Sequence, residues 1–203
     1  MLLVGLGNPG EKYARHRHNV GYMAIDAITD MHDFGPWKAK FRGEACDGAL
    51  GPDRTKILAL KPTTYMNESG ESVGAAMRYL KLSPSHVVVF HDELDLAPAK
   101  VKAKLGGGTA GHNGLRSIEA HIGSEFRRVR IGIGHPGCRE RVYSHVLGDF
   151  AKADLEWLDP VLKAIAEAAP ALLQGDAKFT SALALRLSPP RPKKDRPLNQ
   201  DRA

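Results

Sequence analysis

Long apolar segments are absent from this sequence, since no run approaches the roughly 20 residues that a membrane-spanning helix requires. The first five residues look like a strand and lack the basic start that is typical of a signal peptide. Cysteine occurs twice, at Cys46 and Cys138, without the spacing of a metal site. We therefore expect a cytoplasmic protein with reduced thiols and no membrane association.

Aromatic residues are also few, at 6 % of the 203 residues. Phe126 is the one aromatic residue that adjoins the basic segments near 100–104 and 127–130. This shortage argues against stacking of single-stranded bases there. Apolar residues make up 42 % and charged residues 26 %, as is ordinary for one globular domain. The net charge is +6, and residues 189–203 carry +3 of it. A basic balance of this size is consistent with a polyanionic partner but does not identify one.

Three stretches gather polar side chains that suit ester cleavage. They are His18–Asn19 after a Gly-Asn-Pro-Gly turn, Met66–Asn67, and His91–Asp92 together with His112–Asn113. None of these stretches contains a Ser or Cys that would act as the nucleophile. Because a histidine beside a carboxylate is enough to activate water, the three stretches favour a reaction without a covalent intermediate.

Apolar periodicity predicts a mixture of strands and helices with short connections. Strand-like runs cover 2–6, 41–50, 55–60, 87–90, 99–105 and 129–133, and helical spacing covers 20–31, 73–80, 115–122 and 151–173. This order predicts an α/β protein with a single domain over 1–187, in which helices flank one mixed twisted sheet. The basic, Pro-rich tail at 188–203 should be disordered, because it has too little apolar surface to bury.

Several residues are candidate helix caps. Asn67 or Ser69 is a candidate cap of the second helix, and Asn113 is a candidate cap of the third. Asp159–Pro160 looks like a cap and first-turn pair within the last helical region, and Pro170 should divide that region again. Strand 129–133 alternates apolar residues with arginine and glycine, so we expect one of its faces to be exposed.

Asp92 is expected just past strand 87–90, where α/β sheets commonly place functional groups. A carboxylate there would accept the Nδ1–H of His18, fix the tautomer of the imidazole and stabilise its charged form. The alternatives are that Asp92 is a helix or turn cap and that His18 is a cap or a surface residue. A single aspartate at such a position is a cap about as often as it is catalytic, and a single histidine is more often a cap or a surface residue.

Two further patterns have ordinary explanations. The run Gly5–Gly10 matches the letters of a dinucleotide-binding fingerprint, but Pro9 and a polar loop delay the helix that such a site requires. We interpret the run as a tight turn that presents Asn8. His16 and His18 alternate in a loop and supply too few ligands for a metal, so we expect neither a metal nor another cofactor.

Neutral amides and basic strands complete the candidate residues. Asn8, Asn67 and Asn113 each adjoin a turn or a helix start, where a cap is the usual role. Near His18 and Asp92 they would instead form a hydrogen-bonding cradle suited to a peptide backbone. A set of basic residues offers contacts to phosphates, or else a solvated sheet edge: Lys100, Lys102, Lys104, Arg127, Arg128 and Arg130.

These segments together resemble the signatures of bacterial peptidyl-tRNA hydrolases. The resemblance is carried by Val4–Gly10, Tyr13, Arg17–Gly21, Lys61–Gly70, His91–Leu96, Lys104–Leu115 and Arg130–Gly137. It implies a monomeric α/β enzyme, without an obligate protein partner, that hydrolyses the ester between a peptide and the 3′ end of tRNA. Peptidyl-tRNA would be the substrate, and the released tRNA would return to translation.

The resemblance also implies roles for individual residues. His18 matches the catalytic base, Asp92 matches its support, and Asn8 matches a residue that lines the cleft. On chemical grounds, an amide donor from Asn8 or Asn113 would stabilise the oxyanion. The other matches are cleft residues and a pair that holds a terminal tRNA phosphate: Tyr13, Met66, Asn67, His112 and Asn113 for the cleft, Lys104 and Arg130 for the phosphate. Two departures from the family pattern are His16, where threonine is usual, and Ala99, where glycine is usual.

Two other functions are compatible with parts of this pattern. A non-catalytic RNA-binding relative would keep the fold and the cleft, but the intact His18, Asp92 and asparagines argue against it. A metal-dependent hydrolase would use His91, Asp92 and Asp95 as ligands. Insensitivity to a chelator would exclude that second alternative.

Overall fold

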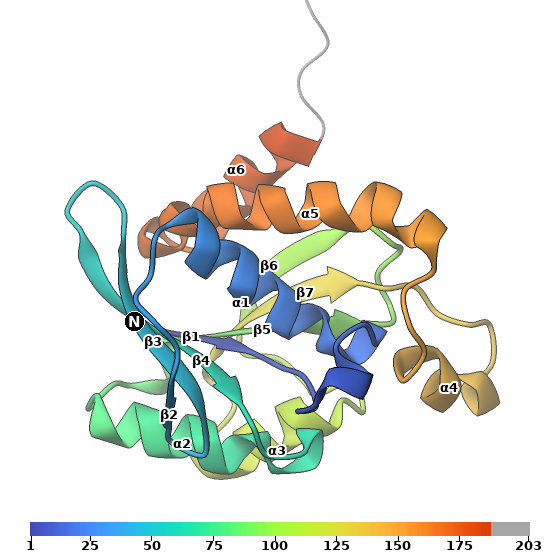
Figure 1. Cartoon of the computed structure of the whole chain (residues 1–203), viewed down its shortest axis with the longest axis horizontal. Helices are drawn as coiled ribbons and strands as arrows, with labels where there is room; N and C mark the ends of the chain where they lie inside the picture. Colours follow the sequence, from blue (N-terminus) through green and yellow to red (C-terminus); the bar gives the residue numbers. More distant parts are fainter. Residues whose placement is uncertain (188–203) are drawn as a thin grey trace, which may run out of the picture.

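One sheet with the strand order β2-β3-β4-β1-β5-β7-β6 runs through the protein (Figure 1). The computed structural model describes residues 1–187. The strands are β1 (Leu2–Gly5), β2 (Lys38–Lys40), β3 (Gly43–Leu50), β4 (Thr55–Pro62), β5 (Val87–Glu93), β6 (Val101–Leu105) and β7 (Arg127–Gly132). Strands β4, β1, β5 and β7 pair in parallel, and the pairs β2–β3, β3–β4 and β6–β7 are antiparallel. The predicted mixed sheet is confirmed.

Helices cover both faces of this sheet (Figure 1). On one face lie α1 (Val20–Met31), α5 (Leu155–Ala168) and α6 (Asp176–Leu187), and on the other lie α2 (Ser69–Tyr79) and α3 (Asn113–Ile122). A short helix, α4 (Val142–Val146), contacts the 3-10 turn at Arg17–Asn19 that precedes α1. Alternate residues of β5 enter the two cores: Val88 and Phe90 face α1, and Val87 and Val89 face α2 and α3. Burial on both faces explains why β5 is an unbroken apolar run.

The start of α1 packs directly on the sheet backbone because two glycines meet there. A β-carbon on Gly21 would lie 2.3 Å from the carbonyl oxygen of Phe90, and one on Gly5 would lie 2.4 Å from the carbonyl oxygen of Gly21. This approach brings the residues that precede α1 over the ends of β1 and β5. The glycines of the 5–10 run therefore serve close packing and a turn, in agreement with the interpretation that they present Asn8.

Two of the expected helix caps are wrong. Helix α2 begins at Ser69, after a 3-10 turn at Met66–Glu68, and has no side-chain cap. Helix α3 is capped by His112, whose ring accepts the backbone N–H groups of Gly114 and Leu115, so Asn113 is the first helical residue. A histidine ring nitrogen can replace the usual oxygen of an N-cap because it offers the same acceptor lone pair.

The expected boundaries of two elements also need correction. Asp159–Pro160 is not a cap, because α5 already begins at Leu155 and Pro160 lies inside it. Proline has no N–H to donate to the carbonyl four residues earlier, which here belongs to Glu156. Glu156 is exposed, so its carbonyl is close to solvent. Asp92 lies within β5 rather than past it. The division near Pro170 is confirmed by the 3-10 helix at Ala169–Gln174.

Strand β7 is covered on both faces instead of being half-exposed. Val129 is buried on one face, and the buried side chain of Arg128 lies on the other. The strand β2 and the helix α6 have no counterpart among the predicted elements. No helix within residues 1–187 is long and apolar enough to cross a membrane. The tail predicted at 188–203 lies outside the described residues.

Candidate active site

Polar side chains gather at the carboxyl edge of the parallel strands. Asn8 follows β1, Met66 follows β4, and Asp92 is near the end of β5. His18 precedes α1, and His112 precedes α3. Open α/β sheets bind ligands at this edge because the loops there leave a crevice outside the strands. The chain thus brings together residues that are up to 104 positions apart in the sequence, from Asn8 to His112.

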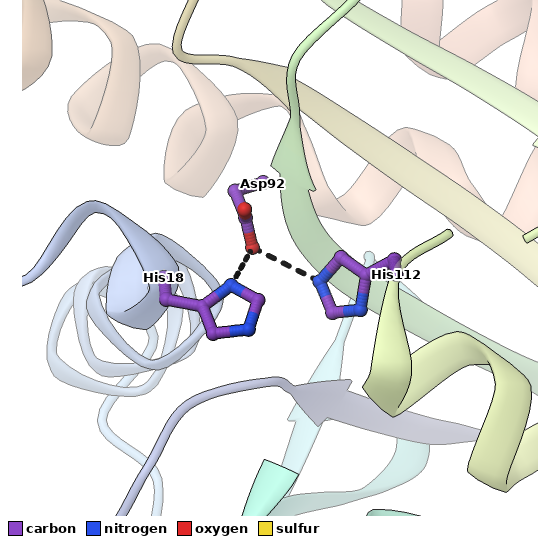
Figure 2. Close-up of side chains that lie close together, drawn as sticks. All are labelled: His18, Asp92 and His112. Carbon is purple, nitrogen blue, oxygen red and sulfur yellow. Dashed lines mark hydrogen bonds and ion pairs between the residues drawn. The ribbon is translucent and has the colours of Figure 1, made fainter. Parts of the chain in front are cut away.

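Asp92 lies between two histidines (Figure 2). His18 Nδ1 is 2.8 Å from Asp92 Oδ1, and His112 Nε2 is 3.0 Å from the same oxygen. The three side chains are largely buried, with 12 %, 3 % and 7 % of the His18, Asp92 and His112 side chains exposed. The carboxylate is therefore held by two ring nitrogens in a site with little access for water.

The cap of α3 determines which tautomer His112 adopts. Its Nδ1 accepts the N–H of Gly114 at 3.1 Å and that of Leu115 at 3.4 Å, so this nitrogen carries a lone pair. The proton of the neutral ring is then on Nε2, which donates to Asp92. The Nδ1–H of His18 donates to the same carboxylate, which leaves His18 Nε2 as a free lone pair. Of the two histidines, His18 is the one with a nitrogen available as a base.

Burial and the ion pair act in opposite directions on the pKa of His18. Burial lowers this pKa by disfavouring the imidazolium, but the charge and the hydrogen bond of Asp92 together raise it above the usual 6.5. For Asp92, burial acts to raise the pKa, but His18 and His112 hold it well below the usual value. Asp92 is therefore ionised at neutral pH and favours the charged form of His18.

His91 is a neutral neighbour of this group. Burial lowers its pKa to about 3, and the nearby His112 acts in the same direction. Its Nδ1 donates to the backbone oxygen of Asp92 at 2.7 Å, and its ring meets the edge of His112 at a centroid distance of 5.2 Å. His91 therefore packs behind Asp92 and His112.

Asn8 is held in place by Asn19, which is buried. The side-chain amide of Asn19 donates to Asn8 O at 2.9 Å, and Asn19 Oδ1 accepts Asn8 N–H at 3.0 Å. Asn8 Oδ1 in turn accepts Met66 N–H at 2.9 Å, so its amide nitrogen faces away from that contact and keeps its donors. This role of Asn19, which is adjacent to His18, was not predicted from the sequence.

A cavity of about 340 Å³ opens beside His18 and Asp92. It is lined on one side by these two residues and His112, and on the other by residues of α4 and the turn before it. Asn113 lines it, but Asn8, Tyr13, Met66 and Asn67 do not. The candidate residues thus form two groups. His112 and Asn113 line the cavity with His18 and Asp92, whereas Asn8, Tyr13, Met66 and Asn67 lie near the turns that follow β1 and β4.

The members of the second group differ in exposure. Met66 is buried, and its sulphur occupies the space beside Gly114, where a β-carbon would lie 2.6 Å from it. Asn67 is exposed, and Tyr13 is partly exposed with its ring against His16. The side chains of Asn67 and Asn113 are exposed and have no hydrogen-bond partner within residues 1–187, so both amides are free to contact a ligand.

A second cavity, also of about 340 Å³, is rich in cationic groups. Lys104, Arg128 and Arg130 line it together with the glycines at 106–108. Cross-strand pairing explains this convergence, since Lys104 of β6 is opposite Arg128 of β7. Arg130 Nε donates to Glu93 Oε2 at 2.8 Å, which orients the guanidinium.

Arg128 is the least expected member of this second cavity. The residue is 2 % exposed and packs over the Phe126 ring, yet none of its three side-chain nitrogens has a partner among the described residues. Burial lowers the pKa of its guanidinium from the usual value. The position of a β-carbon on Gly107 would be 3.4 Å from Arg128 Nη1 and 3.8 Å from Lys104 Nζ, so both cations border the same open space.

Arg127, by contrast, does not belong to this basic group. It projects to the opposite face of the sheet, where Nε donates to Asp176 Oδ1 at 2.7 Å and Nη1 donates to Leu172 O at 3.0 Å. It therefore anchors the C-terminal helices. Consecutive residues of a strand face opposite sides, which separates Arg127 from Arg128.

His18, Asp92 and His112 also have the composition of a metal site, with candidate ligand atoms within 4.8 Å of one another. Coordination through His112 Nε2 would put the ring proton on Nδ1, where two backbone N–H groups already point. The cap of α3 therefore disfavours His112 as a metal ligand. His91 and Asp95, the other expected ligands, are not part of this group.

Comparison with known proteins assigns the family. Residues 2–191 match the family described as peptidyl-tRNA hydrolase. The peptidyl-tRNA hydrolase of Ruegeria pomeroyi is 60 % identical over 192 residues, covering 94 % of this chain and 80 % of the relative. That of Parvibaculum lavamentivorans is 59 % identical over 203 residues, covering 99 % and 98 %.

Solved structures agree with the sequence relatives. The crystal structure of peptidyl-tRNA hydrolase from Acinetobacter baumannii superposes with a TM-score of 0.83 at 38 % identity, covering 90 % of this chain and 93 % of that one. A complex of peptidyl-tRNA hydrolase with n-propanol has the same TM-score and identity and covers 92 % and 94 %. The fold, the ordered motifs and the relatives agree, and the chain belongs to the peptidyl-tRNA hydrolase family, whose members are hydrolases that act on ester bonds.

Proposed function

We propose that this protein hydrolyses the ester between peptide and tRNA with a water that His18 activates. The observation that carries the proposal is the 2.8 Å contact between His18 Nδ1 and Asp92 Oδ1, which leaves Nε2 as the accepting atom. In the reaction, Nε2 takes a proton from water as the oxygen attacks the ester carbonyl. Asp92 stabilises the imidazolium, which then gives the proton to the departing ribose oxygen as the acyl C–O bond breaks, so that the tRNA leaves with a free hydroxyl.

The developing oxyanion needs a hydrogen-bond donor, and Asn8 is the better placed of the two candidate amides. The side-chain oxygen of Asn8, Oδ1, accepts the N–H of Met66, so the side-chain nitrogen of Asn8 is oriented as a donor. Its backbone is fixed by Asn19, and fixed donors are the most effective because they need no reorganisation during the reaction. Asn113 is exposed and lines the cavity, where it would bind substrate rather than the oxyanion.

The remaining candidate residues divide between the two parts of the substrate. Asn67, Tyr13 and Met66 lie near the turns after β1 and β4, where neutral groups suit a peptide of variable sequence. Lys104 and Arg130 suit a tRNA phosphate, and the unpartnered guanidinium of Arg128 adds a third cation. A buried guanidinium whose N–H groups have no hydrogen-bond partner among the described residues favours an anion that can accept from them.

We further propose that no metal takes part. An ester to a ribose hydroxyl is reactive enough for water and a general base. The protons on His18 Nδ1 and His112 Nε2 are already shared with Asp92, and the cap on His112 Nδ1 holds the ring in the tautomer that coordinates metal poorly.

Peptide release from a peptidyl-tRNA, measured with and without EDTA, tests this function. We expect the purified protein to release the peptide at the same rate in both conditions. His18→Ala should lower turnover by about 10²-fold or more, the minimum expected for a general base, while tRNA binding stays within about twofold.

Two results would contradict the mechanism. A His18→Ala variant that keeps more than about a tenth of the wild-type rate would exclude His18 as the base. Loss of activity in EDTA that returns on adding Zn²⁺ would assign the His18, Asp92 and His112 group to a metal. His86→Ala, which removes an exposed histidine outside this group, is the matched control.

A further inference from the structure

The cavity beside His18 has an apolar wall that the proposed chemistry does not use. Val142, Tyr143 and Val146 of α4 form this wall together with Arg139, which lies one helical turn before Tyr143. Tyr143 is 76 % exposed, the largest exposure among the big apolar side chains within residues 1–187. An aromatic ring left this open at the rim of a cavity is suited to stacking on a flat ligand.

The position of this cavity indicates which end of the substrate it receives. Its lining shares His91, Glu93 and Ala110 with the cationic cavity, so the two adjoin. A nucleic acid that places a phosphate between Lys104 and Arg130 would therefore reach His18 by way of the cavity below Tyr143. The turns that carry Asn8 and Asn67 do not line either cavity and are left for the peptide.

The chemistry of the two substrate parts supports the same orientation of the substrate, with its nucleic-acid end in this cavity. The peptide differs from one substrate molecule to the next, so it is best held by neutral amides that contact its backbone. The 3′-terminal nucleoside of tRNA is constant, so a cavity of fixed shape can accommodate it. Asp92 lines the cavity beside His18 but not the cationic one, and its carboxylate suits an uncharged base and its hydroxyls better than a phosphate.

We propose that the cavity between His18 and α4 binds the 3′-terminal adenosine of tRNA, with Tyr143 stacking on the base. Arg139, four residues earlier, adds a planar guanidinium on the same wall. Tyr143 is then a specificity-determining residue for the nucleic-acid end of the ester. The inference rests on the proposed ester hydrolysis at His18 and adds the direction in which the substrate lies.

Short esters separate the two ends of the substrate. The N-acetyl-alanyl esters of adenosine and of a ribose that lacks a base present the same acyl group with and without the stacking partner. Because stacking of one base is worth about 1–3 kcal/mol, Tyr143→Ala should raise KM for the adenosine ester by about 10-fold and leave kcat within about twofold. KM for the baseless ester should not change, and Tyr143→Phe should behave as wild type.

Binding of free adenosine gives a readout without turnover. In an NMR titration we expect adenosine to shift resonances of residues 139–146 in the wild type and to bind Tyr143→Ala about 10-fold more weakly. Tyr79→Ala is the control, since Tyr79 is 63 % exposed and lines neither cavity. Thermal unfolding of each variant checks that α4 is intact.

Three results would overturn the inference. Equal losses on both esters would mean that Tyr143 supports the ester or the fold. A loss that changes with the acyl side chain, tested with N-acetyl-phenylalanyl adenosine, would place the peptide in this cavity. Adenosine shifts confined to the turns at 8–13 and 65–68 would place the base on the opposite side of His18. If the wild type cleaved no ester but still bound adenosine at 139–146, the proposed hydrolysis would fail and this inference would stand.

Discussion

Two histidines share one oxygen of Asp92, but they are not equivalent. His112 Nδ1 accepts two backbone N–H groups, whereas His18 Nε2 has no such partner within residues 1–187. Only His18 can gain and lose a proton without breaking a helix cap. The second hydrogen bond draws electron density from Asp92 and so limits how far the carboxylate raises the pKa of His18.

The pH dependence of the reaction should report the His18–Asp92 pair. His18 acts as a base only when neutral, so kcat/KM should fall as the pH drops through a pKa above 6.5. In Asp92→Asn the carboxylate charge is lost, burial dominates, and the pKa of His18 falls. The acid limb should therefore move to lower pH, while the plateau drops by about 10-fold or more because the amide can select the wrong tautomer.

A profile of kcat/KM between pH 5 and 8.5 measures both effects on a short ester substrate, so that tRNA binding does not contribute. An acid limb at the same pH in wild type and Asp92→Asn would show that another group controls the rate. Full activity of the variant over this range would leave Asp92 with a structural role alone.

Substitution of His112 separates its two contacts. His112→Ala removes both the cap of α3 and the bond to Asp92, so we expect a loss of about 1 kcal/mol in unfolding free energy. His112→Asn keeps a good capping residue and should restore most of that stability. In both variants Asp92 loses the hydrogen bond from His112, so its charge raises the pKa of His18 further. The acid limb of the rate profile should therefore move to higher pH. Urea unfolding and the pH profile together check this, and an unmoved limb in both variants would contradict it.

At the level of elements, the position of His18 depends on how closely α1 approaches the sheet. Gly21 is in the first turn of α1, and a β-carbon there would meet the carbonyl oxygens of Phe90 and Leu6 at 2.3 and 2.6 Å. These are backbone atoms, which cannot move aside as a flexible side chain can. The close contact at Gly21 therefore sets the distance between the loop that carries His18 and the strand that carries Asp92.

Gly21→Ala should consequently lower both stability and activity. We expect a loss of about 1–3 kcal/mol in unfolding free energy from overpacking, and a lower kcat because His18 shifts away from Asp92. Gly74→Ala is the matched change in α2, where the closest contact is the flexible end of Arg78 at 3.1 Å. That variant should keep full activity and gain up to about 1 kcal/mol from helix propensity. Urea unfolding and peptide release measure the pair, and similar behaviour of the two variants would refute the packing argument.

At the scale of the whole molecule, we propose that the substrate spans two adjoining cavities that differ in charge. Asp92 lines the first, Lys104, Arg128 and Arg130 line the second, and Glu93 lies where the two adjoin, so a substrate with a neutral reacting end and an anionic body would fit across both. The overall charge of +6 adds a general attraction for tRNA, which salt screens within about 8 Å at physiological ionic strength.

Lys104→Ala and Arg130→Ala should therefore raise KM for full-length peptidyl-tRNA and leave a short acyl-nucleoside ester almost unaffected. Each should reduce the salt dependence of tRNA binding by at most about one unit of slope, as expected for one phosphate contact. Lys163→Ala on α5, an exposed lysine on the opposite face of the sheet, is the control. Equal losses on the long and the short substrate would place Lys104 and Arg130 in the fold or at the ester instead of at a phosphate.

The sequence by itself determined the α/β class, most of the strands and the family. Apolar runs and helical spacing reflect burial, which acts locally, so β1, β5 and α1 were predictable from composition along the chain. Caps were predicted less well. Asn113 was expected at the start of α3, but a side chain caps only if its rotamer points at the free N–H groups, and His112 occupies that place.

Tertiary structure alone decided the geometry of the site. The pattern of residues predicted a contact between His18 and Asp92. It did not predict His112 on the same oxygen, the hydrogen bonds of Asn19 to Asn8, or an Arg128 beside Lys104 whose guanidinium has no hydrogen-bond partner among residues 1–187. Each of these depends on contacts between elements far apart in sequence, set by strand order and by the glycine contact below α1. Periodicity along the chain records which residues are buried, whereas pairing across the sheet decides which buried residues face one another.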